Sequence, residues 1–233
     1  MKRRPIVAID GPAGAGKTTV SQRVAQELGY VRLDTGALYR CVALASARRG
    51  VDWSDDAGVT KVALDLAKRR AIRFQALGDG NQKVLLDTED VSVQIRDQAM
   101  GQGASRVSAI PGVRSALLDM QRVQGSEGGV VLEGRDIGTV VFPDAEAKFF
   151  LTASPVVRAE RRYQELVDRG QSPELEDIIR EVKERDTRDS QRPVAPLKQA
   201  DDAELVDSSN LDIEEVVTRI VERVRAIEAE LGV

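Results

Sequence analysis

A glycine-rich segment near the start of the chain has the spacing of a loop that binds a polyphosphate. It reads Gly11-Pro12-Ala13-Gly14-Ala15-Gly16-Lys17-Thr18-Thr19 and follows directly on the apolar residues 6–9. This G-x-x-x-x-G-K-[ST] pattern, between a strand and a helix, lets backbone N–H groups and the positive end of the helix dipole converge on phosphates. We expect Lys17 to reach the β- and γ-phosphates and the Thr18 hydroxyl to ligate Mg²⁺. The segment predicts binding of a nucleoside triphosphate rather than an ordinary glycine-rich turn.

Three further segments carry arginines that could neutralise phosphate charge, which phosphoryl transfer requires more than it requires covalent chemistry. Two of them follow expected strands, where ligands of parallel sheets lie: Asp34-Thr35-Gly36-Ala37-Leu38-Tyr39-Arg40 and Glu133-Gly134-Arg135-Asp136-Ile137-Gly138-Thr139. The third is residues 183–192. There Arg185, Arg188 and Arg192 have i, i+3, i+7 spacing, so a helix would present them on one face, with Asp186 and Asp189 on the neighbouring face.

Each of these three segments also has an ordinary structural interpretation. The first could be a strand-to-helix turn with a solvated Arg40, and the second a turn with a surface pair of Arg135 and Asp136. The third could be a solvated charged helix. Because the phosphate loop is present, the three-arginine stripe is better interpreted as a clamp for transition-state charge.

Composition limits the classes of function. The 233 residues suit one mid-sized domain with insertions or two small domains, and 42% apolar residues suffice for a core. The formal charge of −4 argues against general nucleic-acid binding. The chain contains no histidine, so catalysis must depend on Asp, Glu, Lys, Arg and the backbone.

Cysteine and hydropathy indicate the compartment. The single Cys41, expected to be packed and inert, excludes an intramolecular disulfide, which favours a reducing cytoplasm. The basic residues 1–5 precede an apolar run too short for a signal peptide. No segment approaches the roughly 20 apolar residues of a membrane span. We therefore expect no membrane association.

Short apolar runs alternate with helical patterns, which predicts an α/β fold with a parallel sheet covered by helices. We expect strands at residues 6–9, 31–33, 130–132, 148–151 and 204–206. The clearest helix spans residues 213–227, where apolar residues recur at helical spacing, and Asn210 or Asp212 could cap it.

Two stretches interrupt this alternation. Residues 71–87 alternate in polarity on both sides of Gly78-Asp79-Gly80-Asn81, which predicts a β-hairpin inside an insertion at 37–124. Ser154-Pro155 opens a helix, and the Arg- and Glu-dense residues that follow predict a mobile lid at 155–197. The core then comprises residues 1–36, 125–154 and 198–233.

Taken together and in order, these motifs resemble the bacterial cytidylate kinase family. They are the phosphate loop, D-[ST]-G-x-x-Y-R at 34–40, G-R-D-x-G-T-V-V-F-P at 134–143 and K-E-R-D-x-R-D-x-x-R at 183–192. The resemblance implies transfer of the γ-phosphate of ATP to CMP or dCMP with Mg²⁺. It also implies a P-loop nucleoside monophosphate kinase fold: a five-stranded parallel sheet, an inserted acceptor domain with a small antiparallel sheet, and a lid.

The resemblance also implies roles for individual residues. Arg40, Arg135 and Arg192 match the arginines that hold the acceptor phosphate, and Thr35 takes the hydroxyl position, where the family often has Ser. Ser105, Arg114 and Asp136 match contacts to cytosine, although Ser105 could be an ordinary helix cap. Asp189 matches a contact to the sugar, and Arg185 and Arg188 match lid residues that close on the transferred phosphate.

The chemistry of the acceptor agrees with a chain that lacks histidine. A phosphate monoester has a second pKa near 6, so it is already mostly deprotonated at neutral pH and needs no general base. A carboxylate at Asp136 can accept a hydrogen bond from the exocyclic amine of cytosine, whereas uracil presents a carbonyl there.

Two other classes of P-loop protein remain alternatives. A shikimate-type or dephospho-coenzyme-A kinase would share the phosphate loop but lack the Arg135-Asp136 segment in this form. A GTPase switch would normally carry an N-K-x-D motif, which the sequence does not contain. We expect a monomer, because no long apolar edge or heptad pattern indicates a partner surface.

Overall fold

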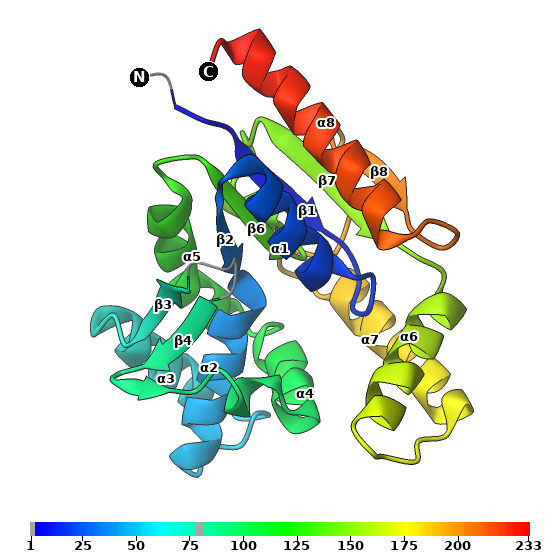
Figure 1. Ribbon diagram of the computed structural model, residues 1–233. Coiled ribbons are helices and arrows are strands. Elements are labelled where there is room, and N and C mark those ends of the chain that lie inside the picture. The colour runs from blue at the N-terminus through cyan, green and yellow to red at the C-terminus, as the bar shows by residue number, and fades with distance from the viewer. Residues whose placement is uncertain (1–2, 78–81) are drawn as a thin grey trace.

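Five parallel strands form the central sheet of the protein, whose computed structural model describes residues 3–77 and 82–233 (Figure 1). Their order across the sheet is β2-β6-β1-β7-β8. The strands are β1 (Ile6–Asp10), β2 (Val31–Asp34), β6 (Val130–Gly134), β7 (Ala147–Thr152) and β8 (Glu204–Asp207). All five lie where the apolar runs predict them, and the central strand β1 is buried along its whole length.

The strands are longer at their carboxyl ends than the sequence predicts. β1 pairs through Asp10 with Gly134, and β2 pairs through Asp34 with Glu133. The apolar runs stop one or two residues before the strand pairing stops. The last paired residues include polar ones, such as Asp10 and Asp34, which lie at the carboxyl ends of the strands. These ends carry the candidate site.

Helices α1 (Lys17–Leu28) and α8 (Ile213–Leu231) pack side by side over one face of the sheet (Figure 1). Val20 and Val24 of α1 join Ile220 and Val224 of α8 in one buried apolar cluster with β1 and β7. Of the two predicted caps for α8, the structure uses Asp212, which forms a capping box with Glu215.

The residues between β2 and β6 have an apolar cluster of their own. They form α2 (Thr35–Arg48), α3 (Asp56–Lys68), β3 (Ile72–Ala76), β4 (Gln82–Leu86), β5 (Glu89–Asp90), η1 (Gln94–Arg96), α4 (Gln98–Val107) and α5 (Pro111–Gly125). Buried Leu38, Leu66 and Leu117 belong to this cluster. The predicted hairpin is confirmed by the antiparallel pair β3 and β4, to which β5 adds a third strand; its predicted turn at 78–81 lies outside the described residues.

The segment after β7 forms two further helices, α6 (Pro155–Asp168) and α7 (Leu175–Gln191). Ser154 caps α6 by accepting a hydrogen bond of 3.2 Å from the Val157 N–H, as the Ser-Pro pair predicts. Within residues 3–77 and 82–233, no helix combines the length and the apolar character that crossing a membrane would require.

The prediction that one helix presents Arg185, Arg188 and Arg192 together is wrong for Arg192. Helix α7 ends at Gln191, and Arg192 follows with extended backbone at φ −61° and ψ 140°. This change of direction turns Arg192 back into the protein, where it is buried, whereas Arg188 stays exposed on the helix.

Candidate active site

The glycine-rich loop lies between β1 and α1, directly against the end of β7. Gly11 comes so close to β7 that a Cβ atom would stand 1.9 Å from the Leu151 carbonyl oxygen, so only glycine fits there. Gly14 and Gly16 have φ values of +78° and +89°, which glycine adopts without strain. No side chain caps the N-terminus of α1. An open helix start and a curled glycine loop are the backbone arrangement that generally suits anionic phosphates.

Lys17 folds back over this loop. Its Nζ donates hydrogen bonds of 2.7 Å to the carbonyl oxygens of Gly11 and Pro12. Burial, and next the positive charge of Arg135, hold the pKa of Lys17 well below its usual value. The loop therefore confines a buried cation beside other cations, an arrangement that an incoming polyphosphate would relieve.

The Thr18 hydroxyl is held by a carboxylate that the sequence analysis left without a role. Thr18 Oγ1 donates a hydrogen bond of 2.9 Å to Glu133 Oε2 at the end of β6. Glu133 Oε1 accepts from Arg32 Nη2 at 2.6 Å and from Ser21 Oγ at 3.1 Å, so the carboxylate is fixed on both sides. In the sequence, the only indication of a role for Glu133 is that it begins the segment 133–139, directly after an expected strand.

The oxygen atoms of Thr18 and Glu133 suit Mg²⁺. Mg²⁺ prefers oxygen ligands and is usually held by one or two carboxylates together with substrate phosphates, not by a cage of protein ligands. Across the part of the chain that the structure describes, no group of three or more carboxylate or thiol side chains is arranged to hold a metal alone. The donor set therefore fits a metal that arrives with a nucleotide.

The first of the three arginine-bearing segments, residues 34–40, forms the start of α2. Asp34 caps the helix by accepting 3.2 Å hydrogen bonds from the Ala37 N–H and from Arg40 Nη1. Burial opposes ionisation of Asp34, but the charges of Arg40 and Arg32 outweigh it and lower the pKa of this carboxyl. The Thr35 hydroxyl is buried and donates to the Glu133 carbonyl oxygen at 2.7 Å, which ties the segment to β6.

Cations from the two other segments meet around Asp189. Arg135 Nε donates to Asp189 Oδ2 at 2.9 Å, and Arg185 Nε lies 4.0 Å from the same oxygen. The pKa of Arg185 is lowered to about 10, first by burial and then by the charges of Arg135 and Arg40. Cations from three distant segments therefore face one another near Lys17.

Asp136 pairs with two buried arginines. Arg114 Nη2 on α5 donates to Asp136 Oδ2, and Arg192 Nη2 donates to Asp136 Oδ1 at 3.3 Å. The Arg114 guanidinium also lies over the Tyr39 ring, 5.5 Å from its centre. Both arginines and Asp136 are at most 7% exposed.

The structure thus brings most of the predicted residues together at the carboxyl ends of the strands. The side chains of two others, Ser105 and Arg188, make no hydrogen bond or ion pair with the other predicted residues that the structure describes. Ser105 is buried near the end of α4 with an Oγ that has no hydrogen-bond partner in the structure. It is inside the helix and is not a cap. Arg188 is exposed and makes no ion pair with the described residues, although its charge still lowers the pKa of Arg185.

Arg158 is a further residue of this region that sequence reasoning missed. It lies on the first turn of α6, is 3% exposed, and donates from Nη1 to the Ala13 carbonyl oxygen at 3.1 Å. The same guanidinium binds Asp186 of α7 in a bidentate pair, with distances of 2.9 and 2.5 Å. Arg158 therefore connects the phosphate loop to helix α7. No local sequence pattern predicts this link, because its partners are far apart in the sequence.

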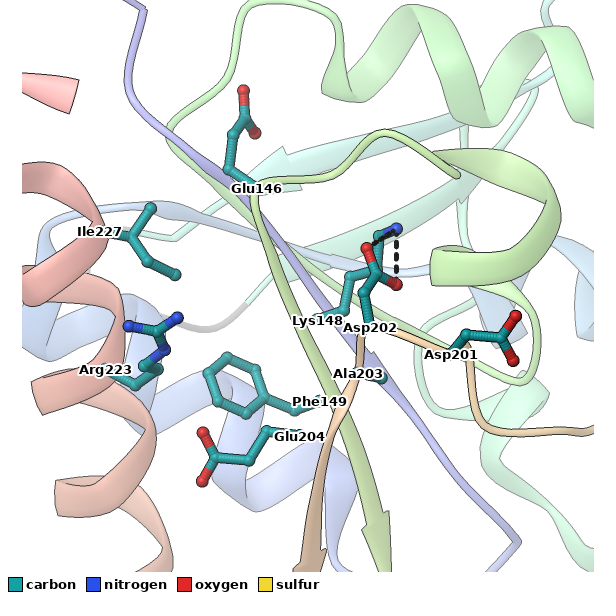
Figure 2. Close-up of a pocket in the computed structure, with 9 residues that line it drawn as sticks. All are labelled: Glu146, Lys148, Phe149, Asp201, Asp202, Ala203, Glu204, Arg223 and Ile227. Carbon is teal, nitrogen blue, oxygen red and sulfur yellow. Dashed lines mark hydrogen bonds and ion pairs between the residues drawn. The ribbon is translucent and has the colours of Figure 1, made fainter. Parts of the chain in front are cut away.

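A surface pocket of about 270 Å³ lies elsewhere, beside α8, β7 and β8 (Figure 2). An ion pair joins two of its lining residues, with Lys148 Nζ 2.7 Å from Asp202 Oδ2. None of the predicted site residues lines this pocket.

Comparison with known proteins agrees with the motifs and their placement. The sequence profile of the family described as Cytidylate kinase matches residues 7–226. The chain belongs to the cytidylate kinase family. A cytidylate kinase of Pelotomaculum thermopropionicum is 48% identical over 97% of this chain and 98% of its own. One of Syntrophotalea carbinolica is 50% identical over 95% of this chain and 92% of its own.

The fold also occurs in a solved structure of distant sequence. An uncharacterized protein from Eubacterium ventriosum superposes with a TM-score of 0.54 at 11% identity, covering 97% of this chain and 99% of the other. At that identity the likeness concerns the fold alone.

Proposed function

We propose that this protein transfers the γ-phosphate of ATP to CMP or dCMP, giving ADP and CDP or dCDP. Membership of the cytidylate kinase family supports this activity. The observation that carries the proposal is the meeting of cations from separate segments: the charges of Arg135 and Arg185 both lower the pKa of Lys17. Such a cluster is suited to two facing anionic nucleotides.

The transfer needs no proton acceptor from the protein. A phosphate oxygen of CMP forms the new bond to the γ-phosphorus, the bond from that phosphorus to the β,γ-bridging oxygen breaks, and ADP leaves with the electron pair. The acceptor oxygen is already deprotonated at neutral pH because the second pKa of a phosphate monoester is near 6. What the protein must supply is alignment and neutralisation of charge.

On the donor side, residues 11–19 would hold the ATP phosphates, with Lys17 on the β- and γ-phosphates. Thr18 would hold Mg²⁺, with Glu133 beside it, since the Thr18 hydroxyl and the Glu133 carboxylate are 2.9 Å apart. When bound, Mg²⁺ would neutralise negative charge on the phosphates as the transfer proceeds.

On the acceptor side, Arg40, Arg135 and Arg192 would hold the CMP phosphate, with Thr35 close by. Asp189 would contact the sugar. Ser105, Arg114 and Asp136 would bind cytosine, and the unpartnered Ser105 Oγ is a polar atom that a base could satisfy. Arg185 and Arg188 would close on the transferred phosphate as catalytic residues.

We also propose a division into a core of residues 1–36, 125–154 and 198–233, an acceptor insertion at 37–124 and a lid at 155–197. The insertion and the two lid helices each have an apolar cluster separate from those of the sheet, which supports independent movement. A monomer in the cytoplasm remains our expectation.

An assay of ADP production with a panel of acceptors tests the activity. We expect turnover with CMP and dCMP and none with shikimate. We expect kcat/KM for CMP to exceed that for UMP by at least roughly tenfold, because uracil would place a carbonyl against Asp136. Equal kcat/KM for CMP and UMP would refute the role of Asp136. Turnover of shikimate alone would refute the proposed function.

Hydrolysis of ATP in the absence of CMP is expected to be far slower than phosphoryl transfer. If α6 and α7 form a lid, its closure over both nucleotides excludes water from the γ-phosphate. The measurement is phosphate release from ATP and Mg²⁺ with and without CMP. Rapid hydrolysis without the acceptor would contradict the lid.

A further inference from the structure

Asp10 is a buried carboxylate that none of the roles above uses. It is the last residue of β1, directly before Gly11, and is 5% exposed. Its two oxygens accept hydrogen bonds from two successive backbone N–H groups, Ile137 to Oδ1 and Gly138 to Oδ2, each 2.8 Å long. A residue at the start of the phosphate loop therefore holds the segment that carries Asp136.

The two N–H groups belong to the first turn of η2 (Ile137–Val141), a short helical element after β6. The first N–H groups of a helical turn have no partner within it, and the residue before the turn usually supplies one through its side chain. Here that residue is Asp136, and its side chain makes no such bond. Asp10 makes the bonds in its place.

Because Asp10 accepts these two hydrogen bonds, the Asp136 carboxylate can form other contacts. An aspartate that caps its own turn directs its oxygens towards that turn. Asp136 instead directs one oxygen to Arg114 and the other to Arg192, both in the proposed acceptor site. With Asp10 in position, Asp136 can serve recognition while η2 remains capped.

Electrostatics shows that this position is costly for a carboxylate. The pKa of Asp10 is raised to about 6, chiefly by burial and in smaller part by the charge of Asp136, although the N–H groups of Gly138 and Ile137 act against the rise. Lys17 is the cation that acts in the opposite direction. A neutral Asn could accept from only one of the two N–H groups, because its amide nitrogen is a donor.

We infer that Asp10 is a positioning residue for the acceptor: by capping η2 in place of Asp136, it frees Asp136 to bind the pyrimidine base. This inference rests on the proposed function, since it assumes that Asp136 contacts cytosine. Asp10 acts through Asp136 and touches neither nucleotide itself. It also joins the loop for the donor phosphates to the loop for the acceptor base through one side chain.

The test is Asp10→Asn, measured for kcat and KM with CMP, UMP and ATP. We expect the ratio of kcat/KM for CMP to that for UMP to fall roughly tenfold, mainly through a higher KM for CMP, because a charged acceptor is lost from two N–H groups. The KM for ATP should not rise. An unchanged ratio of CMP to UMP, or an equal loss for both acceptors, would overturn the inference in favour of a purely structural role.

Asp201→Asn is the matched control for the change in charge, because Asp201 is exposed beside the surface pocket of Figure 2. It should leave all of these constants unchanged. Asp136→Asn separates the two hypotheses. If it lowers discrimination while Asp10→Asn does not, the inference alone fails. If it leaves discrimination intact, the base contact of the proposed function fails, and the inference fails with it.

The double variant Asp10→Asn/Asp136→Asn tests whether the two residues act in one path. If Asp10 acts through Asp136, the double variant should discriminate no worse than Asp136→Asn alone. Additive losses would contradict this. If Asp10→Asn does not fold, hydrogen exchange of the wild-type protein without nucleotide decides: the Ile137 and Gly138 amides should already be protected, and fast exchange would overturn the inference.

Discussion

Lys17→Ala is expected to lower kcat with CMP and ATP by roughly a thousandfold or more, since it removes a charge aimed where negative charge develops in a water-poor site. The fold should survive. Burial and the neighbouring Arg135 already disfavour the charged form of Lys17, as its lowered pKa records, so the loss of this cation removes an unfavourable interaction as well as two hydrogen bonds. The measurements are kcat from ADP production and the melting temperature.

Lys61→Ala is the matched control for this variant. Lys61 is exposed on α3, in the part of the chain between β2 and β6. The control should retain wild-type kcat. Full activity of Lys17→Ala would refute the kinase proposal. The melting temperature shows whether an inactive Lys17→Ala variant is still folded, so that a loss of catalysis can be distinguished from a loss of structure.

The elements that place Lys17 could be predicted because their signals are local. An apolar run, a fixed glycine spacing and an amphipathic helix occupy consecutive residues, and the structure has β1, the loop and α1 in that order. The same holds for Ser154 as the cap of α6 and Asp212 as the cap of α8. Each of these features depends on residues within one or two turns of one another.

The partners of charged side chains could not be predicted from local signals. Thr18 meets Glu133 across 115 positions, and Ile137 meets Asp10 across 127. These contacts depend on the strand order β6-β1-β7, which puts strands remote in sequence next to each other. Helical spacing also misplaced Arg192, because a pattern of charges does not show where a helix ends. Its burial beside Asp136 depends on a backbone turn that follows α7.

Arg188→Ala is expected to lower kcat at least roughly a hundredfold with little change in the KM for CMP. Arg188 is exposed, and it makes no ion pair with the residues that the structure describes. Its charge nevertheless lowers the pKa of Arg185, so it acts electrostatically on the cation cluster. An arginine that engages the phosphate only as charge develops contributes to kcat and not to ground-state binding.

Arg180→Ala provides the matched control on the same helix. Arg180 is exposed and pairs with Asp177 at 2.5 Å, one helical turn away, so its removal deletes the same side chain from α7 at a point remote from the cluster. The control should keep wild-type kcat and KM. A rise in the KM for CMP at constant kcat in Arg188→Ala would place Arg188 in ground-state binding of the acceptor. Equal losses in both variants would mean that α7 responds to the loss of any arginine. The relative changes in kcat and KM therefore decide whether Arg188 contacts the phosphate mainly in the transition state or already in the ground state.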